Sequence, residues 1–275
     1  MANKWLKGVL WLGLLAFLLN TFHVNAKAED RKVPITLENE ALVMVPGTGA
    51  TVDRFDKLIV QLQKTTACEV LKITVQTNGQ LTIKGELSQK ASQPIIVIGF
   101  ADSSEETVPK QAVWYEKAMT YVQHQYGVEH YNFLGHSNGG LVLTDYLEYV
   151  SLSIDPKPNK ILFLGTPFND VGWKYNEMTP TFNEVKKVSD VLKRYLDNKQ
   201  RLPKTISVVS VAGNVADGNS DGTVPVTSLL AGGLIYGDSQ SYQTFLVTEN
   251  AKHSQLVVHP TVMRLIQTFL WSAKK

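Results

Sequence analysis

The feature of the sequence that most restricts its fold is a repeated order, in which a short apolar run is followed by a segment with helical spacing. Apolar runs that are candidate strands lie at 42–45, 94–100, 161–164 and 206–211. Between them, residues 108–126 place apolar side chains at steps of three and four, which predicts a helix with one apolar face. Continuous apolar runs are typical of parallel strands buried on both faces. The alternation therefore predicts an α/β fold with a mainly parallel central sheet flanked by helices.

A hairpin is predicted in addition to the parallel strands. The runs at 70–75 and 81–83 flank Asn78-Gly79, a dipeptide typical of two-residue β-hairpin turns. A last predicted strand at about 242–247 precedes an amphipathic segment at 261–271, which we expect to close the fold as a helix.

One segment stands apart from this order. Residues 169–203 look like an inserted and mostly helical piece between two predicted strands. Its large side chains are Trp173, Tyr175, Met178, Phe182 and Tyr195. Beside the carboxyl ends of the strands, such a small helical insertion can form a lid or one wall of an acyl pocket. Ordinary packing of a helical cap is the alternative, and the sequence leaves both open.

The N-terminus has the three parts of a secretory signal peptide. Lys4 and Lys7 precede an uncharged apolar run at 9–19, and Ala26-Lys27-Ala28 resembles a cleavage site. The run is shorter than the roughly 20 apolar residues that span a bilayer. An uncleaved anchor and a buried N-terminal helix are the alternatives. We expect residues 1–28 to be a signal peptide, residues 29–275 to form a single domain, and the protein to be secreted or held at the cell surface.

Composition excludes several classes of protein. A hydrophobic fraction of 44% is too high for a disordered chain. The one cysteine, Cys68, cannot form an internal disulfide, and we expect a buried, inert thiol. Residues 1–28 hold three lysines and no acid, so their removal leaves 24 basic and 25 acidic residues and a net charge of −1. This charge does not favour nucleic acid as a partner.

The candidate nucleophile lies in a G-x-S-x-G motif, Gly-His-Ser-Asn-Gly at 135–139. The motif alone is modest evidence, but an apolar strand at 131–134 leads directly into it and a helical segment follows at once. A strand, a sharp turn and a helix are the setting of a nucleophile elbow, which presents a serine at the end of the strand. The sequence therefore predicts Ser137 as a nucleophile; an ordinary serine in a glycine-rich turn is the alternative.

A serine nucleophile needs a histidine base, and in this architecture the acid and the histidine follow the serine along the chain. His124 and His130 precede Ser137, and His136 lies inside the motif. The remaining candidates are His253, in a loop just after the last strand, and His259, which stands before Pro260 at a predicted helix start. We favour His253.

The acid is expected after the strand at 206–211, where Asp217 and Asp221 are available. We favour Asp221, which lies at a tight turn before a new helix. Asp217, Asn219 and Asp221 also match the first half of a calcium loop, but Ser228 stands where such a loop needs a glutamate. We therefore expect no metal and no cofactor.

Two backbone N–H groups are expected to stabilise an oxyanion. One belongs to Asn138, the residue after the nucleophile. The other is expected in the loop after an early strand, where Thr48 lies between two glycines. A phosphate-binding glycine loop is the alternative, but no G-K-[ST] follows it.

With these motifs in place, the chain resembles the α/β-hydrolase superfamily from about residue 36 to its end. More narrowly, it resembles an exported or cell-surface α/β-hydrolase family of unknown function from Gram-positive bacteria. The matching stretches are Gly-His-Ser-Asn-Gly at 135, Thr-Pro-Phe at 166, Ser-Asp-Gly-Thr-Val-Pro at 220 and His-Ser at 253. The resemblance implies an α/β-hydrolase fold and a triad of Ser137, Asp221 and His253. Where many hydrolases have His-Gly in the first loop, this chain has Pro46-Gly47.

The sequence thus predicts an exported serine hydrolase, with a small-molecule carboxylic ester as the favoured substrate. A thioesterase, a peptidase or an acyltransferase would use the same triad. A cell-surface binding module on this fold is the alternative from another class. Peripheral association with the cell envelope is left open.

Overall fold

A single eight-stranded sheet forms the centre of the described residues, which are 33–176, 185–215 and 218–272 of this computed structural model. The strand order is β3-β2-β4-β1-β5-β6-β7-β8, and all neighbours are parallel except β2 and β3. The strands are β1 (Ala41–Val45), β2 (Cys68–Val75), β3 (Leu81–Gly85), β4 (Gln93–Phe100), β5 (His130–His136), β6 (Lys157–Leu164), β7 (Ser207–Gly213) and β8 (Ser241–Val247).

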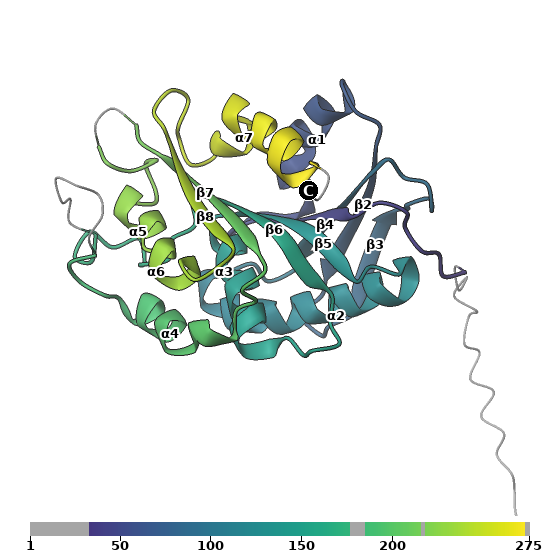
Figure 1. Cartoon of the computed structure of the whole chain (residues 1–275), viewed down its shortest axis with the longest axis horizontal. Coiled ribbons are helices and arrows are strands. Elements are labelled where there is room, and N and C mark those ends of the chain that lie inside the picture. Colours follow the sequence, from purple (N-terminus) through teal and green to yellow (C-terminus); the bar gives the residue numbers. More distant parts are fainter. Residues whose placement is uncertain (1–32, 177–184, 216–217, 273–275) are drawn as a thin grey trace, which may run out of the picture. The chain divides into compact units, whose positions relative to one another are not determined.

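Helices cover both faces of this sheet (Figure 1). The α-helices are α1 (Asp56–Gln63), α2 (Val108–Tyr126), α3 (Asn138–Asp145), α4 (Asp190–Asn198), α5 (Val226–Leu230), α6 (Gly232–Tyr236) and α7 (Pro260–Leu265). The 3-10 turns are η1 (Val52–Phe55), η2 (Glu105–Thr107), η4 (Lys199–Arg201) and η5 (Leu256–Val258). Two π-helical turns extend α3 and α7, namely η3 (Tyr146–Val150) and η6 (Ile266–Leu270).

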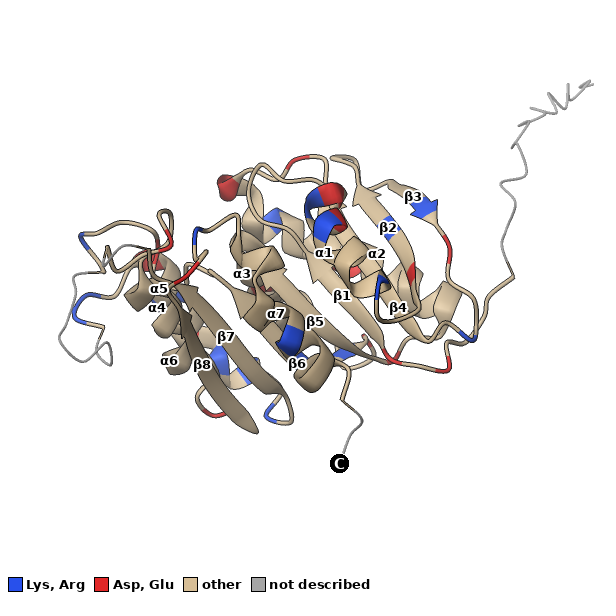
Figure 2. Ribbon diagram, turned by 90° about the horizontal axis from the view of Figure 1, so that it is seen from above, with Lys and Arg blue, Asp and Glu red and all other residues tan. Residues whose placement is uncertain are grey.

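The core consists of two main layers because strand side chains alternate between the two faces of the sheet. Val43 packs with the layer that contains α2 and α3, whereas its neighbours Leu42 and Met44 pack with the layer that contains α1 and α7. Figure 2 shows α1 and α7 lying over the same face. Burial on both faces explains why these strands read as continuous apolar runs.

Local signals fix the ends of several elements. Gly79 has φ +83° in the turn between β2 and β3, and Val75 pairs with Leu81 across the hairpin. Helix α2 has a proline in its first turn, and it is capped at its C-terminal end by Gly127, whose φ is +63°. Both positions need a left-handed conformation, which glycine adopts without steric cost.

The sheet has a topological switch between β1 and β5. The chain leaves β1 toward α1 on one face, and it leaves the neighbouring β5 toward α3 on the other face. The two loops diverge at the carboxyl ends of the strands, where open α/β sheets bind ligands in the resulting crevice. The topology therefore predicts a ligand site at this edge.

The predicted α/β fold and its mainly parallel sheet are confirmed, including the hairpin and the closing helix. Within 169–203, the described helical parts are α4 and the turn η4, whereas 169–176 form turns. The predicted signal peptide at 1–28 lies outside the described residues. Within the ranges that are described, no helix is long and apolar enough to cross a membrane.

Candidate active site

Ser137 occupies a sharp turn between β5 and α3. Its φ is +55° and its ψ is −131°, a conformation that is unfavourable for a residue with a side chain. The Ser137 N–H donates to the Leu164 carbonyl at 2.8 Å, which ties the turn to the end of β6. The helix after the turn packs against the β1 end, where a Cβ atom on Gly139 would collide with the carbonyl oxygen of Val45. These glycine and serine positions give the geometry expected of a nucleophile elbow.

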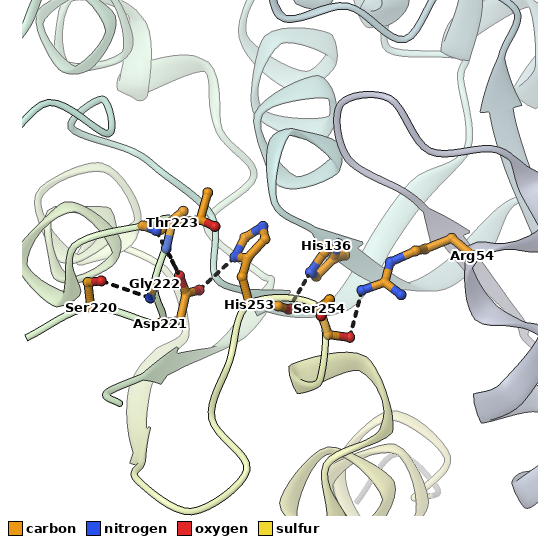
Figure 3. A network of polar contacts seen from close by, with 9 residues as sticks. Arg54, His136, Ser220, Asp221, Gly222, Thr223, His253 and Ser254 are labelled. Atoms are coloured by element: carbon orange, nitrogen blue, oxygen red, sulfur yellow. Dashed lines mark hydrogen bonds and ion pairs between the residues drawn. The ribbon is translucent and has the colours of Figure 1, made fainter. Parts of the chain in front are cut away.

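Asp221 and His253 form a hydrogen-bonded pair at the same edge of the sheet (Figure 3). Nδ1 of His253 lies 2.6 Å from Oδ2 of Asp221. The Asp221 side chain is 1% exposed, and its other oxygen, Oδ1, accepts from the N–H groups of Thr223 at 2.9 Å and Val224 at 2.7 Å. The His253 N–H also donates to the Asp221 carbonyl at 2.8 Å. The pair fixes the imidazole with Nδ1 toward the carboxylate, which leaves Nε2 to face a substrate.

Ser137 and His253 both lie near the end of β6, although no hydrogen bond joins them among the described residues. Ser137 bonds to Leu164, and the next residue, Gly165, lies so close to His253 that a Cβ atom there would be 3.0 Å from Nδ1. In free enzymes the hydrogen bond between nucleophile and base is often long and tightens with substrate. The geometry thus joins the predicted acid and base directly and places the serine at the same edge.

The loop after β1 passes over Ser137. A Cβ atom on Gly47 would lie 2.5 Å from the Ser137 Cβ atom, so only glycine permits this approach. The next residue, Thr48, accepts a hydrogen bond at Oγ1 from Nδ2 of Asn138, at 2.7 Å. The backbone N–H groups of Thr48 and Asn138 have no acceptor within the described part of the chain. Two unpaired donors therefore flank Ser137, and their role as oxyanion donors stays a prediction.

His136 and Arg54 were not singled out by the sequence, yet both contact the loop that carries His253 (Figure 3). Nε2 of His136 lies 3.0 Å from the His253 carbonyl oxygen, and Nη2 of Arg54 donates to the Ser254 carbonyl at 2.7 Å. Burial, and then the neighbouring His253 and Arg54, lower the pKa of His136 to about 3. His136 is therefore neutral at physiological pH.

The other candidate residues have different positions. His259 caps α7, since its Nδ1 accepts from the Thr261 N–H at 3.1 Å, in agreement with its predicted place at a helix start. His124 is exposed near the end of α2. Asp217 lies outside the described residues. Asp221, which the calcium alternative would use, directs its carboxylate to His253 and two N–H groups. Across the described ranges, no group of three acidic, histidine or cysteine side chains is arranged to hold a metal ion.

The insertion is held to the fold by two buried asparagines that the sequence did not indicate. Nδ2 of Asn176 donates at 3.0 Å to the carbonyls of Asn169, Asp170 and Gly172, and Oδ1 of Asn169 accepts from the Ser189 N–H at 2.8 Å. These bonds join both ends of the segment around 177–184, which lies outside the described residues. The base of the insertion is therefore a specific hydrogen-bonded structure.

The aromatic residues of the insertion divide between core and surface. Tyr195 is buried in the core layer with α3 and α6, so it fits the packing interpretation. Trp173 is 51% exposed. The Lys174 and Lys187 ammonium groups lie over the Tyr175 ring, at 4.7 and 5.4 Å from its centroid. Met178 and Phe182 lie outside the described residues.

A hollow of about 300 Å³ opens beside the Asp221–His253 pair. Its lining includes Gly222, Thr223, Lys252 and Ser254. Ser137 is itself partly exposed, and Thr48 is exposed above it. Ser137 and His253 are thus partly exposed to solvent, whereas the Asp221 carboxylate is buried behind the imidazole.

Comparisons with known proteins agree with this architecture. The family model described as "Alpha/beta hydrolase of unknown function (DUF915)" matches residues 34–273. A crystal structure of a Listeria innocua protein is similar, with a TM-score of 0.79 and 27% identity over 86% of this chain and 96% of that one. A protein of Lactobacillus plantarum WCFS1 assigned as a cell surface hydrolase is also similar, with a TM-score of 0.72 and 30% identity over 86% and 93% of the two chains. Comparison with curated proteins gives no match.

Proposed function

The chain belongs to the DUF915 family of alpha/beta hydrolases of unknown function, and from this premise we propose that it is an exported serine hydrolase that cleaves carboxylic esters. The observation that carries the proposal is the 2.6 Å bond between His253 and Asp221 at the sheet edge where Ser137 occupies a turn with positive φ. A buried, fully hydrogen-bonded carboxylate behind an imidazole is the arrangement that orients a general base.

Each residue has a defined role in the proposed reaction. Ser137 Oγ attacks the acyl carbon while Nε2 of His253 takes the hydroxyl proton, and Asp221 stabilises the resulting imidazolium. The N–H groups of Thr48 and Asn138 donate to the oxyanion. The tetrahedral intermediate collapses, the C–O bond of the ester breaks, and His253 gives its proton to the leaving alcohol. Water activated by His253 then attacks the acyl-enzyme and releases the acid.

The location is part of the proposal. A basic start, an apolar run and Ala26-Lys27-Ala28 support export by a signal peptide at 1–28, with residues 29–275 as the hydrolase domain. The similarity to a Lactobacillus plantarum protein assigned as a cell surface hydrolase supports the same location. Peripheral association with the cell envelope is consistent with it, and small-molecule acyl compounds are the proposed substrates.

Substitution of the nucleophile tests the mechanism. We expect Ser137→Ala to lower turnover of p-nitrophenyl acetate and butyrate by on the order of 10⁴-fold or more, because the triad acts as a unit. A fluorophosphonate probe should label the wild-type protein and leave the variant unlabelled. Ser153→Ala, in an exposed loop, is the matched control and should keep both properties. Wild-type turnover by Ser137→Ala would overturn the assignment.

A substrate panel separates the ester from its alternatives. Esters of increasing acyl chain length are measured beside thioester and peptide substrates, using the same wild-type protein and Ser137→Ala as the blank. The proposal expects kcat/KM to be highest for an ester. A higher value for a thioester or a peptide would keep the triad and replace the substrate class.

A further inference from the structure

We propose that His136 is a positioning residue that holds the general base in place through the main chain of the base's own loop. The inference rests on the proposed function, because it assigns His136 a role through His253. His136 lies between Gly135 and Ser137 of the motif. The proposed mechanism assigns it no role.

The contact is specific in its atoms. Nε2 of His136 lies 3.0 Å from the His253 carbonyl oxygen, and the centroids of the two imidazole rings are 4.6 Å apart. A carbonyl oxygen only accepts hydrogen bonds, so Nε2 of His136 carries the proton. The His136 side chain is thus a donor aimed at the backbone of the residue that bears the base.

The second nitrogen of His136 supports the same tautomer. Nδ1 is buried and has no partner among the described residues, so this tautomer leaves an acceptor nitrogen unpaired and not an N–H donor. His136 is only 4% exposed. It packs beside the base as a neutral ring, and this matters because His253 becomes positively charged during the proposed reaction. A second cation at a centroid distance of 4.6 Å would oppose that charge.

The loop needs such support from other segments. Residues 248–255 connect β8 to η5, and most of them, including Lys252, Ser254 and Gln255, are exposed. Arg54 donates to the Ser254 carbonyl at 2.7 Å, so two consecutive carbonyls are held by side chains from different elements. With its backbone held by His136, the His253 ring keeps the orientation that its bond to Asp221 defines. A displacement of about 1 Å in a catalytic group can cost on the order of 100-fold in rate.

Two substitutions with side chains of similar size distinguish the effect of the hydrogen-bond donor from the effect of packing alone. His136→Met fills the space without a donor, and His136→Gln places an amide N–H near the position of Nε2. We expect His136→Met to lower kcat for p-nitrophenyl acetate by about 10- to 100-fold with KM within twofold. His136→Gln should recover kcat to within about threefold of wild type. His124→Met, at an exposed position on α2, is the control.

A second readout does not depend on turnover. The Nδ1 proton between His253 and Asp221 should give a resonance far downfield in the proton spectrum, because the bond is short at 2.6 Å. In His136→Met this resonance should weaken or broaden through loss of a fixed ring orientation, and in His136→Gln it should persist. If the wild-type protein turned over no ester, the proposed function would fail, while the resonance would still test the contact.

The outcomes are distinct. Loss of kcat and of the resonance in His136→Met, with recovery in His136→Gln and an unchanged melting temperature, supports the proposal. A folded His136→Met with wild-type kcat and an intact resonance overturns it, as does a folded His136→Gln that is as impaired as His136→Met. If His136→Met does not fold, His136→Asn replaces it, because its shorter amide does not reach the His253 carbonyl.

Discussion

Nδ2 of Asn138 lies 2.7 Å from Oγ1 of Thr48, so the two residues proposed to supply the oxyanion donors are joined by their side chains. Asn138 begins α3, and Thr48 lies in the loop after β1. The bond crosses the crevice between the two strands at the topological switch. It fixes the spacing of two backbone N–H groups that would otherwise depend on an exposed loop.

Removal of the Thr48 hydroxyl is predicted to slow the reaction without removing a backbone donor. Thr48→Val keeps the shape of the side chain and loses the acceptor, so we expect kcat and kcat/KM for p-nitrophenyl acetate to fall together by about tenfold. This is less than the roughly 100-fold typical of losing a donor itself. Thr48→Ser keeps the hydroxyl and should stay within about threefold of wild type. Equal activity of the Val and wild-type proteins would show that the side-chain bond does not set the spacing.

Gly165 is predicted to be sensitive to substitution because it lies against the acid–base pair. A Cβ atom there would lie 2.8 Å from Oδ2 of Asp221 and 3.0 Å from Nδ1 of His253, and the residue has φ +54°. Gly165→Ala should therefore lower kcat at least tenfold, because it pushes into the hydrogen bond that orients the base. The measurement is ester turnover together with the melting temperature.

A matched glycine distinguishes this effect from backbone strain. Gly79 has φ +83°, and a Cβ atom there meets only the flexible end of Lys117. Gly79→Ala should cost roughly 1 kcal/mol in stability through its positive φ and leave kcat unchanged. An equal loss of kcat in the two variants would contradict the role assigned to Gly165.

The buried Glu148 carboxyl predicts a pH dependence of stability. Its exposure is 0%, neither oxygen has a partner within the described residues, and burial raises its pKa from 4.5 to about 8, opposed in part by Arg201. The folded state thus binds the proton more tightly than the unfolded state. Its contribution to stability is most favourable below pH 4.5 and declines as the pH rises toward 8, by at most about 1.4 kcal/mol per pH unit.

Glu148→Gln removes this titration and keeps the shape of the side chain. We expect the variant and the wild type to have similar free energies of unfolding at pH 4, and the variant to be more stable at pH 8. Urea titrations at several pH values measure the difference. A stability difference that stayed constant between pH 4 and pH 8 would contradict a folded-state pKa near 8.

Much of the fold was predictable because its signals are local. The apolar runs of β1, β4, β6 and β7 reflect burial on both faces, and Asn78-Gly79 specifies its hairpin within two residues. The elbow at Ser137 is also local, since strand, turn and helix are adjacent in sequence. The π-helical turn η3 was not predicted, because it continues the apolar pattern of α3.

The supporting residues of the site were not predictable from the sequence. The hydrogen bond between Arg54 and Ser254 joins residues that are 200 positions apart in the sequence, and no periodicity or motif marks either partner. His136 was set aside because it lies inside the nucleophile motif, so its contact with the His253 loop became visible only with β5 and β8 in place. The buried Glu148 resembles any glutamate on a helix surface, since η3 packs against α2, α4 and η4, which are distant from it in the sequence.

The hydrogen bonds around the site also determine at which stage of folding the site is complete. The hydrogen bonds from Asn138 to Thr48, from His136 to His253 and from Arg54 to Ser254 connect residues 90, 117 and 200 positions apart. No local segment contains all the parts, so the chain must complete the sheet from β1 to β8 before the base faces the serine. Such long-range contacts form and break with the whole domain and not with a single hairpin or helix. We therefore expect the proposed hydrolytic activity to be gained and lost together with the global structure of the domain.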